Sequence, residues 1–119
     1  MKKILFVRKY KKTSGGQIKV RDYFRHCLEQ PELEPYIYFT PDSQPHCDGT
    51  WAMLPPERRV DALHPEAYDL LFLAGRDWEY LPAISPDTKI INLLQHVKHG
   101  DPLDPRFAHV SRPAQRICV

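Results

Sequence analysis

The sequence lacks the short motifs that mark the best-known phosphate-binding and hydrolytic sites. It contains neither the G-x-x-x-x-G-K-[ST] phosphate-binding loop nor the G-x-G-x-x-G dinucleotide fingerprint, and no G-x-S-x-G nucleophile elbow. A phosphate-receiver domain would need an acidic pair after its first strand, where Arg8 and Lys9 stand instead. These absences exclude an assignment from one motif, so any functional signal must lie in the order and spacing of less specific features.

Long apolar runs and paired cysteines are also missing. No run approaches the roughly 20 apolar residues of a membrane span, and the run at residues 4–7 is too short for the core of a signal peptide. The three cysteines, Cys27, Cys47 and Cys118, are odd in number and far apart, which is typical of reduced thiols. We therefore expect a cytoplasmic protein, and covalent cysteine catalysis has no support.

The composition is that of one globular domain. A length of 119 residues with 42% apolar and 27% charged residues is sufficient to bury a core. The net charge of +2 conceals an uneven distribution, because nine Lys and Arg residues stand against Asp22 alone up to Arg25. This basic start favours contact with phosphate, nucleic acid or an anionic membrane surface, although a solvated helix face explains several of the charges equally well.

The first thirty residues predict a strand followed by a helix. Residues 4–7 form the short, continuous apolar run of a buried parallel strand. A helix is expected from residue 18 to about residue 29, because apolar side chains recur on one face at Val20, Tyr23, Phe24, Cys27 and Leu28.

The segment between them predicts a phosphate-binding loop at Ser14, Gly15, Gly16 and Gln17. Ser14 and Gln17 have the spacing of a capping box, with Ser14 as N-cap. A strand, a glycine turn and a helix N-terminus gather backbone N–H groups and the positive end of the helix dipole at one point, which favours an anion. The alternative is that the glycines serve only a tight turn.

Further strands are expected at residues 36–40, 69–74 and 89–94, and residues 116–119 are expected to begin another strand. The connection at residues 41–59 is rich in proline and polar groups, and one short strand is expected near residues 50–54. Residues 76–81 are expected to form one helical turn. Short apolar strands separated by such connections indicate an α/β fold: a single domain over residues 1–119, with a Rossmann-like parallel sheet, helices on both faces and three layers.

Three strand exits carry glycine, charge or histidine: residues 14–17, 75–77 and 95–101. In parallel sheets, ligands bind outside the carboxyl ends of the strands. We therefore expect these three turns to converge on one edge of the sheet and to form the functional site.

The last of these turns contains two histidines. His96 or His99 is placed to hydrogen-bond a substrate hydroxyl or to transfer a proton, because imidazole titrates near neutral pH. A metal held by His96, His99, Asp101 and His109 is an alternative, but no zinc motif spacing is present. A surface turn without a function for either histidine also remains open.

The exit at residues 75–77 offers a second polar group. Arg76 and Asp77 are candidates to bind a ligand carboxylate, phosphate or hydroxyl, with Lys98 on the same edge. Equally, Asp77 has the residue type of an N-cap for the short helical turn that follows. Trp51 and Trp78 lie in expected loops and are harder to assign to the core than the strand aromatics.

The order of these segments resembles the first half of the GT-B-fold glycosyltransferases of the large retaining "group 1" family. The matching segments are residues 3–7 followed by Ser14-Gly15-Gly16, residues 68–73, residues 91–96 and residues 111–119. No single motif is specific; the order and spacing carry the resemblance across nearly the whole chain.

The resemblance implies the N-terminal, acceptor-side domain of a hexosyltransferase-type enzyme that moves a sugar from a nucleotide diphosphosugar to an acceptor. It implies that Gly15 and Gly16 approach the donor diphosphate and that His96, with His99 as competitor, contacts the transferred sugar. The family's nucleotide-holding second domain is missing from these 119 residues, so we expect this chain to be inactive alone. It is expected to be either a fragment, the N-terminal half of a two-domain enzyme, or a half-protein that works with a partner. No cofactor and no metal are implied.

Two further hypotheses stand beside this one. The chain could be a stand-alone Rossmann-like module that binds anions or another molecule through its basic start, with peripheral contact at the inner membrane face but not with nucleic acid. The weakest hypothesis is a metal-dependent enzyme built on His96, His99 and Asp101.

Overall fold

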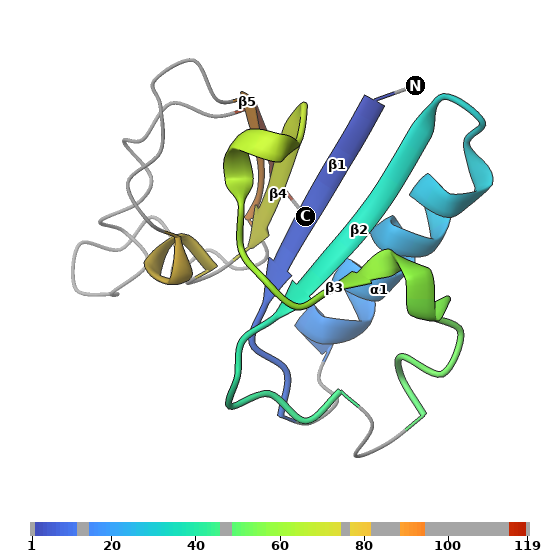
Figure 1. Ribbon diagram of the computed structural model, residues 1–119, viewed down its shortest axis with the longest axis vertical. Coiled ribbons are helices and arrows are strands. Elements are labelled where there is room, and N and C mark those ends of the chain that lie inside the picture. The colour runs from blue at the N-terminus through green and yellow to red at the C-terminus, as the bar shows by residue number, and fades with distance from the viewer. Residues whose placement is uncertain are drawn as a thin grey trace.

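The computed structural model describes residues 2–11, 15–45, 49–74, 77–81, 89–94 and 115–118. These residues form a six-stranded parallel sheet in the order β3-β2-β1-β4-β5-β6 (Figure 1). The strands are β1 (Lys2–Arg8), β2 (Leu33–Phe39), β3 (Arg59–Val60), β4 (Leu70–Ala74), β5 (Lys89–Leu94) and β6 (Gln115–Cys118). This is the order of doubly wound sheets, in which the direction of winding reverses between β1 and β4. The predicted α/β fold with a Rossmann-like parallel sheet is confirmed.

Strand β1 lies at the centre of the sheet and is buried on both faces. It pairs with β2 along its whole length, from Lys2 opposite Leu33 to Arg8 opposite Phe39, and its middle pairs with the first residues of β4. Because side chains alternate along a strand, Ile4 and Phe6 belong to one core cluster and Leu5 and Val7 to the other. The continuous apolar run of the sequence is therefore explained by two buried faces.

Helix α1 (Gly15–Glu29) covers one of these faces and lies behind β2 in Figure 1. It buries Val20, Phe24 and Cys27 against the sheet. The ring of Phe24 meets Phe6 edge-on, with centroids 5.1 Å apart. Burying a side chain of this size contributes about 2 kcal/mol, so the helix is anchored mainly by this stripe. The helix begins three residues earlier than the apolar pattern indicated.

The opposite face of the sheet packs against later segments of the chain. Leu5, Val7, Leu71, Leu73 and Ile90 form its buried cluster, which partly buried residues from 60–68 and 80–81 cover. The 3-10 helices η2 (Pro65–Ala67) and η3 (Asp77–Tyr80) belong to these segments. The turn predicted at residues 76–81 is confirmed as η3, and the three-layer arrangement stays a prediction.

The short strand expected near residues 50–54 is wrong. Residues 50–53 form turns, and the short strand of this connection is β3, which follows the 3-10 helix η1 (Pro56–Arg58). The apolar residues that suggested a strand are instead used as a plug: Trp51 is 1% exposed, and its ring lies 5.3 Å from Phe39 and 5.8 Å from Phe24. Trp51 is therefore a core residue contributed by a loop.

Strand β2 begins earlier than predicted because it accommodates a proline. Pro35 lies inside the strand opposite Ile4, although proline has no N–H group for a strand ladder. The pairing of β3 reaches only Ile37 and Tyr38. Beside Pro35 the outer side of β2 thus has no partner strand in the described pairing, and the missing N–H group interrupts no hydrogen bond there.

Candidate functional site

The site is built at the carboxyl end of β1, where the strand finishes on a charged residue. Arg8 follows Ile4 and Phe6 on the α1 side of the strand by the alternation of side chains. It is only 7% exposed. The first turn of α1 lies at the same edge, since the Gln17 side-chain amide donates a hydrogen bond to the Lys9 carbonyl at 3.2 Å. A buried guanidinium group is thus placed beneath a helix N-terminus.

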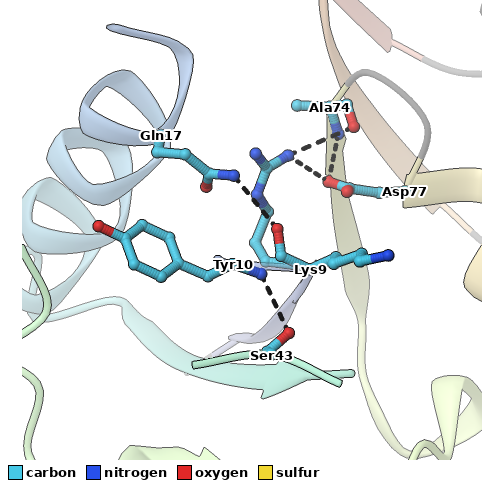
Figure 2. Close-up of polar contacts among 7 residues, drawn as sticks. Lys9, Tyr10, Gln17, Ser43, Ala74 and Asp77 are labelled. Atoms are coloured by element: carbon cyan, nitrogen blue, oxygen red, sulfur yellow. Dashed lines mark hydrogen bonds and ion pairs between the residues drawn. The ribbon is translucent and has the colours of Figure 1, made fainter. Parts of the chain in front are cut away.

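Arg8 is joined across the sheet to the residue that follows β4. Its Nη1 donates to Oδ2 of Asp77 at 2.7 Å and to the Ala74 carbonyl at 3.4 Å (Figure 2). The same Asp77 oxygen accepts the backbone N–H of Ala74 at 2.9 Å. Asp77, which is 4% exposed, therefore turns back onto the end of β4 and fixes one side of the guanidinium.

Burial dominates the protonation of this carboxyl group. It raises the pKa of Asp77 to about 6, against the opposing effects of the Arg8 charge and of the hydrogen bonds from Ala74 and Arg8. At neutral pH the carboxylate is therefore mostly ionised and the ion pair is intact. A buried pair of this kind gains Coulomb energy but loses the hydration of both ions, so its net effect on stability is small compared with the cost of removing one partner.

The rest of the Arg8 guanidinium has no partner in the described structure. Among the described residues, the hydrogen bonds of the guanidinium are all formed by Nη1, and Nε is buried without a hydrogen-bond partner there. The edge formed by Nε and Nη2 presents two parallel N–H groups, the geometry with which arginine binds carboxylate or phosphate. A buried donor left unsatisfied costs about 1–3 kcal/mol, so this edge calls for an explanation.

The loops after β1 and β2 are tied together and hold this region in place. The Thr40 N–H donates to the Arg8 carbonyl at 2.9 Å, and Ser43 Oγ accepts the Tyr10 N–H at 3.0 Å. Lys9 Nζ lies 2.8 Å from Asp42 Oδ2. The hydrogen bond from Lys9 is the main cause that lowers the pKa of Asp42 to about 2. Lys9 is therefore partly neutralised by its neighbour.

The predicted basic surface is smaller than the sequence suggested. Arg8 is buried, Lys9 faces Asp42, and Arg21 and Arg25 both lie within ion-pair distance of Asp22. Charge counted along the sequence does not reveal such pairs, because the partners of Arg8 and Lys9 are distant in the chain.

Several predicted site residues can be placed and others cannot. Gly15 and Gly16 open α1, as a helix-starting glycine pair should, and Asp77 lies beside Arg8. Ser14, Arg76, His96, Lys98 and His99 lie outside the described residues, so their predicted roles and the capping box stay predictions. Asp101 and His109 of the metal hypothesis also lie outside; no group of three potential metal ligands occurs within the described ranges.

Sequence reasoning missed Arg8 as a functional candidate. The available signal was its position two residues after Phe6, on the helix-facing side of the central strand and at the strand's carboxyl end.

The structure also describes the side chain of Cys27 and bears on the question of a membrane span. Cys27 is buried, which raises the pKa of its thiol to about 11 and makes it unreactive. In the part of the chain that the structure describes, no helix has the length and apolar character needed to cross a membrane.

Comparisons of the chain with protein-family models, with curated proteins and with solved structures find no match. The strand order and the geometry around Arg8 and Asp77 are therefore the observations from which a function is inferred.

Proposed function

We propose that this chain is the N-terminal, acceptor-side domain of a glycosyltransferase that moves a sugar from a nucleotide diphosphosugar to an acceptor. The observation that carries the proposal is the position of the Arg8–Asp77 pair at the point where the winding of the sheet reverses. In open α/β sheets, ligands bind in the crevice outside the carboxyl ends of the strands at this point. A buried cation there suits the diphosphate of such a donor.

The electrostatic balance of this edge supports an anionic ligand. Arg8 and Asp77 carry opposite charges that offset each other, while the N-terminus of α1 adds the equivalent of about half a positive charge. The backbone N–H groups of the first helical turn have no partner within the helix. The sum of these contributions is positive, as a site for a diphosphate requires.

The sequence resemblance supplies the transferred group and the second half of the site. In that pattern the glycines at the start of α1 approach the diphosphate and a histidine at position 96 or 99 contacts the sugar. A second domain would hold the nucleotide. The chain alone is therefore proposed to bind the donor weakly and to transfer nothing, and peripheral membrane contact belongs to the proposal only if the acceptor is a lipid.

The test uses the natural polypeptide that contains this chain, with any sequence that follows it. Calorimetry against a panel of nucleotide diphosphosugars should detect binding of at least one, and release of nucleoside diphosphate in the presence of a suitable acceptor should follow. If the natural polypeptide binds none of the panel, the glycosyltransferase proposal is abandoned.

A stand-alone anion-binding module is the second candidate, favoured by the interior cation at the sheet edge. It predicts that the natural polypeptide is no longer than this chain and binds anions without any transfer. Retention on an anionic matrix separates a surface origin of that binding from an interior one. The substitution of Lys9, Lys11 and Lys12 by Gln weakens retention only if the basic loop is responsible.

A further inference from the structure

Arg8 has donor capacity that the described structure leaves unused. Within the described ranges, Nη1 is the only side-chain nitrogen of Arg8 that forms hydrogen bonds, to Asp77 and to the Ala74 carbonyl. The Nε–H group is buried and has no hydrogen-bond partner among the residues that the structure describes, and the side chain of Arg8 is 9% exposed. A guanidinium that is nine-tenths buried, with an unsatisfied N–H group, raises the free energy of the folded state unless a ligand accepts that hydrogen bond.

The unused edge has a definite chemical preference. Nε–H and one N–H of Nη2 point in parallel, which matches two oxygens of one carboxylate or phosphoryl group. The nearby start of α1 adds further N–H donors and the positive end of the helix dipole. A tetrahedral oxyanion suits this arrangement, because its remaining oxygens can accept hydrogen bonds from the backbone N–H groups. The Asp77 carboxylate occupies Nη1 and so directs the incoming anion to the other edge.

We propose that the Nε–Nη2 edge of Arg8 binds one phosphoryl group of an anionic ligand at the carboxyl edge between β1 and β4, with Asp77 as the residue that positions the guanidinium. The inference rests on the proposed function only for the source of that group, a nucleotide diphosphosugar. The anion contact itself follows from Arg8 and would hold for any phosphorylated ligand of suitable shape.

The direct readout is the side-chain Nε–H signal of Arg8 in nuclear magnetic resonance spectra of the 119-residue chain. Inorganic pyrophosphate is the probe, with acetate at equal ionic strength as the carboxylate comparison. The Arg8 signal should shift with saturation on addition of pyrophosphate and much less with acetate. No saturable shift with pyrophosphate, or an equal response to acetate, overturns the phosphoryl assignment.

Variants of Arg8 test whether the paired Nε–H and Nη2–H donors, and not the positive charge alone, bind the anion. Arg8→Lys keeps the charge but loses the paired donors, and pyrophosphate affinity should fall about tenfold or more, the loss expected for one charge-assisted hydrogen bond. Removing Arg8 alone would leave the buried Asp77 carboxylate without its cation. The second test is therefore the double variant Arg8→Gln with Asp77→Asn, in which pyrophosphate binding should be abolished. Lys3→Gln removes one charge at the exposed, opposite end of β1 and is the matched control with wild-type affinity.

Each outcome assigns success or failure to one proposal. A folded double variant that binds pyrophosphate as the wild type does overturns the role of Arg8. Sugar transfer by the natural polypeptide with an unchanged KM for the donor in that variant overturns it too, yet leaves the glycosyltransferase proposal standing. Binding that depends on Arg8 without any sugar transfer supports the anion site and contradicts the proposed enzyme.

Discussion

At the scale of single residues, the fold depends on a few side chains whose partners are distant in the sequence. Arg8 and Asp77 are 69 residues apart and form one ion pair. The side chain of Trp51, which lies in a loop, packs against Phe24 and Phe39 in the core. No local pattern identifies such partners. The sequence predicted that Arg8 and Asp77 each follow a strand, but their pairing depends on β1 and β4 being neighbours.

The Asp77 carboxyl should make stability depend on pH. Its pKa is about 6 in the folded chain and 3.8 in the reference state, so the native protein binds this proton more tightly than the unfolded chain. The resulting stabilisation is complete below about pH 4 and is lost as the pH rises through 6, by about 3 kcal/mol at most. Urea unfolding of wild type and Asp77→Asn from pH 4 to pH 7 checks this.

The wild-type advantage in the free energy of unfolding should shrink over that range, because Asn binds no proton. The lowered pKa of Asp42 acts below about pH 4 and does not disturb the comparison. A wild-type advantage that grows with pH would mean that the attraction of Arg8 outweighs the burial of Asp77.

Trp51 offers a test of the loop plug. Trp51→Ala should lower the free energy of unfolding by about 3–5 kcal/mol, as for other buried large-to-small changes. Trp51→Phe should cost much less, because the buried Nε1 has no hydrogen-bond partner to lose in the part of the chain that the structure describes. Ala52→Ser, at an exposed neighbour, is the control for the loop itself. Equal stability of Trp51→Ala and wild type in urea titrations would remove Trp51 from the core.

At the scale of elements, the sequence predicted the central strands and α1 well because each has a strong local signal. Continuous apolar runs marked β1, β4 and β5, and one apolar face marked α1. The connection between β2 and β4 was predicted poorly. Its apolar residues serve a loop that packs on the core, and a two-residue strand such as β3 has no periodicity to detect.

The hydrogen bonds between the loops after β1 and β2 should stabilise the carboxyl edge. Ser43→Ala removes the acceptor of the Tyr10 N–H and one contact of the Thr40 hydroxyl, and should cost about 1–3 kcal/mol in urea unfolding. Amide hydrogen exchange at residues 9–11 should quicken while that of residues 4–7 changes only with global stability. Ser43→Thr, which keeps the hydroxyl, should restore most of the loss. Unchanged exchange at residues 9–11 would contradict the link between the loops.

At the scale of the whole molecule, the sheet order gives meaning to the separate signals. The sequence predicted a parallel sheet and convergence of strand exits on one edge, and the parallel sheet is confirmed. The neighbours β1 and β4 could not be derived, since 61 residues separate the two strands and parallel pairing leaves no local turn signature. Because the winding reverses between β1 and β4, the buried Arg8–Asp77 ion pair lies where ligands bind in such sheets, and it is therefore a candidate ligand site.

Ligands are proposed to bind at the carboxyl edge between β1 and β4. The most direct measurement is a titration of the isotope-labelled chain with a nucleotide diphosphosugar, followed through its backbone amide signals. We expect the shifts to cluster at the carboxyl ends of the two strands and at the start of α1, at Arg8, Gln17, Ala74 and Asp77. Shifts confined to the opposite edge, around Lys3 and Asp69, or no shifts at all, would contradict it.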